Sequence, residues 1–185
     1  MSRIGELPIV FKGTSIDVKP DLISFTGPFG TNSVSVPFWL KVNVDNNEKI
    51  LHIEPEYIGK DKSRKALWGT LNRLLNNAAN GVIKKFESKI KLSGLGFKCE
   101  IIGDKMTFFL SYNTPRVLMV PKGLTVKVEQ GINVTISGIN LQQIGEFTNI
   151  ITKLRKYNVY TGKGLLWTSN KKRVYIKKPT KSKGK

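Results

Sequence analysis

The stretch "KGTSIDVKPDLISFTG", residues 12–27, decides the fold, because its pattern returns later in the chain. Residues 122–138, "KGLTVKVEQGINVTISG", align with it once a single inserted residue is allowed. Each copy alternates apolar and polar residues on both sides of a turn signal, which is typical of a half-buried β-hairpin. The corresponding positions are Ile16 with Val126, Val18 with Val128, Ile23 with Val134, Phe25 with Ile136, and Gly27 with Gly138.

A helical pattern with an internal glycine, Gly69 or Gly145, follows each hairpin further along the chain. Residues 60–86 and 140–156 carry apolar residues three or four apart, which predicts one apolar stripe on each helix. The stripes are Leu67, Leu71, Leu74, Leu75, Ala78, Val82 and Phe86 in the first, and Leu141, Ile144, Phe147, Ile151 and Leu154 in the second.

Short alternating runs separated by Gly, Pro, Asn and Asp account for most of the remaining chain and predict strands. The fold class is therefore α+β, with two tandem duplicated domains, each a small antiparallel β-sheet packed against an α-helix. A chance similarity between two hairpins is the alternative. We expect an N-terminal domain over residues 1–87, a C-terminal domain over residues 88–176 and a basic tail over residues 177–185.

The charge is far from balanced. The chain has 31 basic and 13 acidic residues among 185, a formal net charge of +18, which predicts a polyanionic partner. No window approaches the ~18 consecutive apolar residues of a membrane span, so no membrane partner is expected. A single cysteine cannot form an internal disulfide.

Catalytic and cofactor-binding patterns are missing from the sequence. His52 and Cys99 are the only histidine and cysteine, which leaves too few ligands for a metal site and no histidine-based nucleophilic triad. "GLGFKC" departs from the dinucleotide-binding glycine pattern at Cys99, and "TGKG" lacks the remaining residues of a phosphate-binding P-loop. The sequence therefore predicts a protein that is not an enzyme and holds no cofactor.

The C-terminal part combines charge with aromatic residues. Residues 147–185 contain 12 of the 31 cations and no acid, and Tyr157, Tyr160, Trp167 and Tyr175 are interleaved with them. Aromatic faces can stack on bases while cations neutralise phosphates, and the glycines of "TGKG" could bring backbone N–H groups to a phosphate. The predicted RNA contacts here are Lys153, Arg155, Lys156, Lys163, Lys171, Lys172, Arg173, Lys177 and Lys178.

Two alternatives stay open. The aromatic residues could simply pack on the second domain. Duplex DNA is the competing polyanion, although the sequence has no helix-turn-helix, zinc finger or basic zipper, and neither helix carries a dense row of base-reading side chains.

The chain resembles the bacterial-type ribosomal protein L six family of the large subunit from its start to about residue 172. The resemblance rests on "SRIGELPI", "ALWGTLNRLLNNAANGVIKKFE", "LSGLGFKC", "SYNTPRVLMVPKGLTVKV" and, most specifically, "NVYTGKGL". In this last motif Tyr157 replaces the family's usual proline and Thr161 replaces a lysine. These departures, with a composition that suggests an AT-rich gene, favour a mitochondrial ribosome.

The resemblance implies two tandem domains of similar fold and a place near the sarcin–ricin loop and the translation-factor site. It implies that the second domain binds rRNA, with Tyr160, Gly162, Lys163, Gly164, Arg3 and Lys98 as contacts. The implied partners are large-subunit rRNA, neighbouring ribosomal proteins and nearby translation factors. The expected location is a ribosome in the mitochondrial matrix, with a bacterial cytoplasm or another organelle as the alternative.

Overall fold

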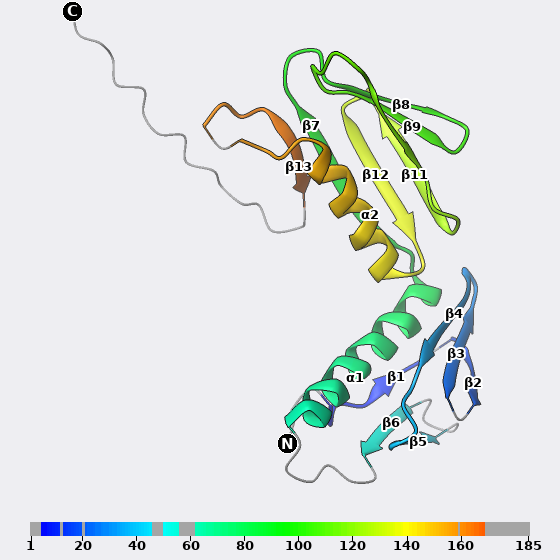
Figure 1. Ribbon diagram of the computed structural model, residues 1–185. Coiled ribbons are helices and arrows are strands. Elements are labelled where there is room, and N and C mark those ends of the chain that lie inside the picture. Colours follow the sequence, from blue (N-terminus) through cyan, green and yellow to red (C-terminus); the bar gives the residue numbers. More distant parts are fainter. Residues whose placement is uncertain are drawn as a thin grey trace, which may run out of the picture. The chain divides into compact units, whose positions relative to one another are not determined.

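The computed structural model describes residues 5–11, 13–19, 21–45, 50–55, 62–158 and 160–168, and these form an α+β protein (Figure 1). Its Cα atoms divide into two compact units. Unit 1 comprises Met1–Phe86 with Ile139–Leu141, and unit 2 comprises Glu87–Gly138 with Gln142–Lys185. Each unit combines antiparallel strands with one α-helix, so the predicted fold class is confirmed.

Unit 1 contains two three-stranded sheets, ordered β1-β6-β5 and β2-β3-β4, and the helix α1. Its elements are β1 (Ile9–Val10), β2 (Ser15–Lys19), β3 (Leu22–Gly27), β4 (Gly30–Ser35), β5 (Leu40–Asp45), β6 (Ile50–Pro55) and α1 (Lys62–Ile83). Residues from both sheets and from α1 share one apolar core, including Ile9, Phe25, Leu51, Leu75 and Val82.

The helix α1 buries a face slightly rotated from the predicted stripe. Leu71, Leu75, Ala78 and Val82 are buried as expected. Leu67 and Leu74, however, are 50% and 36% exposed, so their assignment to the core is wrong. Trp68 takes the inward position instead, since its large side chain is buried and its Nε1–H donates to the Ile53 carbonyl at 3.0 Å. Phe86, also assigned to the stripe, begins the strand β7 rather than ending the helix.

Unit 2 contains a three-stranded sheet, β10-β9-β8, a four-stranded sheet, β11-β12-β7-β13, and the helix α2 (Figure 1). Within α2, Ile144, Phe147 and Ile151 are buried, whereas the predicted stripe residue Leu141 is 41% exposed. The elements are β7 (Phe86–Ser93), β8 (Lys98–Ile102), β9 (Lys105–Phe109), β10 (Arg116–Met119), β11 (Leu124–Glu129), β12 (Asn133–Gly138), α2 (Leu141–Leu154) and β13 (Gly164–Thr168).

The two repeated stretches form hairpins with the same register. In unit 1 β2 and β3 pair Ile16 with Phe25 and Val18 with Ile23. In unit 2 the corresponding residues pair in the same way, Val126 with Ile136 and Val128 with Val134. The inserted residue lies in the turn between β11 and β12. Glu129 pairs with Asn133 across that turn, whereas Lys19 pairs with Leu22 across the shorter turn between β2 and β3.

Two features of the described residues bear on nucleophilic and metal chemistry. Burial, with the neighbouring carboxylate of Glu100, raises the pKa of the Cys99 thiol to about 12, which keeps it protonated and a poor nucleophile at neutral pH. No group of three or more His, Cys, Asp or Glu side chains that could hold a metal ion occurs in this part of the chain. No helix among the described residues is long and apolar enough to cross a membrane.

Candidate nucleic-acid interface

The segment between α2 and β13 forms a tight loop that Asn158 organises. The Asn158 side-chain oxygen accepts hydrogen bonds from the N–H groups of Tyr160 (2.9 Å) and Thr161 (3.4 Å). The Asn158 carbonyl accepts one from Gly162 N–H (2.8 Å), and the Asn158 N–H donates to the Lys163 carbonyl (2.9 Å). The loop is therefore closed by the Asn158 side chain together with the loop's own backbone.

Two glycines make this closure possible. Gly162 has φ +68°, and Gly164 has φ +133°, conformations that side chains with a Cβ rarely adopt. A Cβ on Gly164 would also lie 2.5 Å from Tyr157 Cα and 2.6 Å from the Lys156 carbonyl oxygen. Gly164 thus lets the start of β13 pass directly against the end of the α2 segment.

This geometry corrects the expectation about phosphate binding by backbone N–H groups at Gly162. The N–H groups of Tyr160, Thr161 and Gly162 already donate within it, so they are not free to cradle a phosphate. What the loop presents outward is side chains. Lys163 and Thr161 are exposed, and Tyr160 is 70% exposed. Lys163 therefore carries its exposed ammonium group on a loop that is closed by hydrogen bonds.

Arg155 has a different position from the one that the sequence suggested. Its guanidinium lies over the rings of Tyr112 (4.9 Å to the centroid) and Phe97 (5.1 Å), and one of its N–H groups donates to the Leu110 carbonyl. Its backbone carbonyl accepts from Leu165 N–H at 3.0 Å. Arg155 therefore joins separate segments of unit 2 and is half-buried, whereas Lys153 and Lys156 on either side of it are exposed.

The glycine-rich turn at residues 94–97 lies beside this loop. Ser93 donates its hydroxyl to the Gly162 carbonyl at 2.7 Å, which ties the end of β7 to the loop. Phe97 is buried, whereas Leu95 is 90% exposed, and Lys98, the first residue of β8, is exposed. The structure thus brings Lys98 and Lys163, which are far apart in sequence, onto connected segments of one unit.

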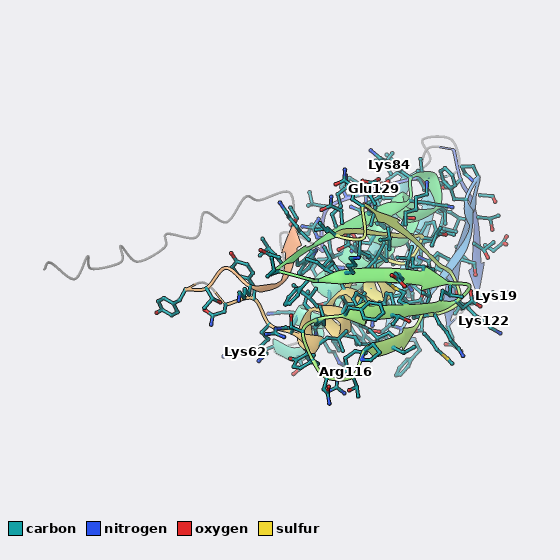
Figure 2. The ribbon with its side chains drawn as sticks, turned by 90° about the horizontal axis from the view of Figure 1, so that it is seen from above. Lys19, Lys62, Lys84, Arg116, Lys122 and Glu129 are labelled. Atoms are coloured by element: carbon teal, nitrogen blue, oxygen red, sulfur yellow. The ribbon has the colours of Figure 1, made fainter. Side chains whose placement is uncertain are left out.

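The sequence reasoning missed Tyr112 and Arg116. The guanidinium of Arg116 lies over the Tyr112 ring, 5.6 Å from its centroid, and the Tyr112 hydroxyl donates to the Leu154 carbonyl at 3.3 Å. Their only signal was an aromatic residue and an arginine four apart in "SYNTPR", which says nothing of Arg155. Figure 2 shows Arg116 at the periphery of the drawn side chains.

The strand β13 was also missed. Gly164–Thr168 pairs antiparallel with β7, Leu165 is buried, and Trp167 is 52% exposed. Part of the aromatic, basic segment is therefore built into a sheet. Of the aromatic residues in this segment that the structure describes, Tyr157 is half-buried, whereas Tyr160 and Trp167 are exposed. The other predicted contacts, Arg3, Lys171, Lys172, Arg173, Lys177 and Lys178, lie outside the described residues.

The charge is divided unequally along the chain. Residues 1–86 contain 12 cations and 8 acids, a net +4, whereas residues 87–185 contain 19 cations and 5 acids, a net +14. The second half therefore carries most of the electrostatic attraction for a polyanion.

Comparison with known proteins gives a consistent result. The chain is 33% identical to the large ribosomal subunit protein uL6 of Burkholderia vietnamiensis over 183 residues, which cover 99% of this chain and all of the relative. The same proteins of Burkholderia ambifaria and Burkholderia cenocepacia are each 33% identical over 184 residues, with the same coverage. No protein-family model matches the sequence. These relatives are bacterial and give no support to the mitochondrial location.

Proposed function

The chain belongs to the family of large ribosomal subunit protein uL6, and from this premise we propose that it is a structural constituent of the large ribosomal subunit that binds rRNA through unit 2. The observation that carries the proposal is the concentration of charge, with a net +14 from residue 87 onward. Phosphate neutralisation by such cations supplies most of the sequence-independent affinity for nucleic acid.

We assign the direct contacts to exposed side chains on the connected loops of unit 2. These are Lys98, Lys153, Lys156, Tyr160 and Lys163. Gly162 and Gly164 contribute by shaping the loop, and Arg155 by fixing it from within. Arg3, Lys171, Lys172, Arg173, Lys177 and Lys178 remain predicted contacts.

The proposed place is near the sarcin–ricin loop and the translation-factor site, among neighbouring ribosomal proteins and with translation factors passing nearby. The role is non-catalytic, which the protonated Cys99 thiol supports. For the compartment, the bacterial relatives favour the cytoplasm of a bacterium over the mitochondrial matrix.

A competition experiment tests this function. The full chain is bound to a labelled transcript of large-subunit rRNA that contains the sarcin–ricin loop, and either unlabelled transcript or duplex DNA of equal phosphate content is added. We expect the transcript to compete at least about tenfold better, because its loops and irregular helices offer shapes that a DNA duplex lacks. Equal competition would replace the ribosomal function by general cationic binding.

A further inference from the structure

Four side chains of unit 2 form an alternating arrangement of rings and guanidinium groups. We call Phe97, Tyr112, Arg116 and Arg155 the arginine–tyrosine cluster. Arg155 lies over the rings of Phe97 and Tyr112, and Arg116 lies over the ring of Tyr112. The members come from the turn before β8, the connection between β9 and β10, the start of β10 and the end of the α2 segment.

The cluster becomes more exposed from one end to the other. Phe97 is 4% exposed, Arg155 is half-buried, Tyr112 is 46% exposed and Arg116 is exposed. The inner members are held in place, because Arg155 donates to the Leu110 carbonyl and Tyr112 to the Leu154 carbonyl. At the outer end the backbone of Arg116 is fixed by its pairing with Phe108 in the sheet. A planar cation is thus held over an aromatic ring at the surface.

The charges of the cluster are not balanced within the protein. Among the residues that the structure describes, no carboxylate pairs with Arg116 or Arg155, although both lie over the same ring. The guanidinium carbons lie 5.6 Å (Arg116) and 4.9 Å (Arg155) from the centroid of that ring, so the two positive charges repel each other. An anion beside Arg116 would relieve that repulsion. The guanidinium plane itself offers a flat, weakly hydrated surface, on which nucleobases stack.

We propose that the arginine–tyrosine cluster receives one unpaired nucleobase of RNA, which stacks on Arg116 while its phosphate lies beside the two guanidinium groups. This rests on the proposed function, which it makes more specific by adding a base contact to the phosphate contacts. The base must be unpaired, because the flat faces of paired bases are covered by their neighbours in a duplex.

Two RNA probes separate stacking from charge. One is an adenosine decamer, and the other is a decamer of the same ribose-phosphate backbone without bases, which keeps the phosphates. Binding of the full chain to each labelled probe is measured by fluorescence anisotropy. The Arg116→Lys variant keeps the positive charge and loses the planar guanidinium. Arg73→Lys is the matched control, because Arg73 is an exposed arginine of α1 in unit 1.

We expect Arg116→Lys to lower the preference for the adenosine decamer by roughly 5- to 100-fold, the effect of one stacked base, and to change binding of the abasic decamer by less than about twofold. Arg73→Lys should bind both probes as the wild type does. An unchanged preference in Arg116→Lys overturns the proposal and leaves the cluster as a purely structural support for the loops.

The same variants distinguish this proposal from the proposed function. If the wild type prefers rRNA to duplex DNA but Arg116→Lys loses no base preference, the base site is wrong and the ribosomal function stands. If the base preference depends on Arg116 but rRNA and duplex DNA compete equally, the cluster binds unpaired RNA and the ribosomal function is wrong.

Discussion

The two units repeat one hairpin but differ in what surrounds it. The hairpins of β2–β3 and β11–β12 pair corresponding residues in the same register, and each unit contains one helix. The net charge, however, is +4 before residue 87 and +14 from it onward. Within the part of the chain that the structure describes, the closed loop at residues 158–163 and the arginine–tyrosine cluster both belong to unit 2. The duplication thus explains the fold, and the added loops and charges explain the proposed binding.

The largest expected effect is on rRNA affinity, when removal of three positive charges from unit 2 is compared with removal of three from unit 1. One variant changes three exposed residues of unit 2 to Gln: Lys153, Lys156 and Lys163. The other changes three exposed residues of unit 1 to Gln: Lys62, Arg73 and Lys84. At about 0.1 M salt, loss of three phosphate contacts should weaken rRNA binding about 100-fold and lower the slope of log K against log salt by about 2 to 3.

The unit 1 variant should change affinity by less than about threefold at that salt concentration, because none of its three cations is among the proposed contacts. Filter binding over a salt series measures both quantities. Equal losses in the two variants would show that binding follows total charge and not unit 2.

Stability should respond more strongly to the buried polar residue of α1 than to that of α2. Asn72 donates to the carbonyls of Gly5 (3.0 Å) and Leu7 (2.8 Å), whereas Thr148 donates only to the Ser88 hydroxyl (3.1 Å). Asn72→Ala leaves two backbone acceptors without this donor and should cost about 2–3 kcal/mol, against about 1 kcal/mol for Thr148→Val. Urea unfolding measures both, and the reverse order would contradict these assignments.

The corresponding glycines Gly27 and Gly138 test whether the two hairpins also have similar surroundings at matching positions. A Cβ on Gly27 would lie 2.8 Å from the Val82 backbone oxygen of α1, whereas one on Gly138 would meet the flexible end of Leu124 at 2.7 Å. Gly27→Ala should therefore cost roughly 1–3 kcal/mol, and Gly138→Ala less than about 1 kcal/mol. Hydrogen exchange of each unit resolves the two effects, and a larger loss for Gly138→Ala would show that Leu124 cannot move aside.

The smallest effect concerns pH and is confined to unit 2, which contains the single cysteine. Folding raises the pKa of the Cys99 thiol from 9.0 to about 12. Above pH 9 the unfolded chain loses this proton and the folded chain keeps it, so stability falls as pH rises. Between pH 8 and 10 the wild type should lose about 1 kcal/mol more than Cys99→Ala. If the free energy of unfolding changes equally with pH in the two proteins, the Cys99 thiol is not kept protonated by folding.

The sequence predicted the repeated parts of the structure well, for a physical reason. Hairpins and amphipathic helices leave local periodic patterns, so the registers of β2–β3 and β11–β12 agree with the alignment. The exact inward face of α1 was less predictable, because Trp68 displaces Leu67 by its size and its hydrogen bond to Ile53.

The candidate site was only partly predictable. The exposed lysines and the glycines of "TGKG" were recognised, but the closure of the loop by the Asn158 side chain was not, since asparagine is common in all loops. The arginine–tyrosine cluster was missed because its members are brought together by tertiary packing alone. β13 was missed because its partner, β7, is distant in sequence.

The most direct test of the central claim is sedimentation of a source-cell lysate through sucrose gradients at low and high salt, with this chain detected in each fraction. We predict that the chain travels with the large ribosomal subunit at low salt. The variant with Gln in place of Lys153, Lys156 and Lys163 should be released at a lower salt concentration than the unit 1 variant. If the wild type remains at the top of the gradient at both salt concentrations, the chain is not a constituent of the large subunit.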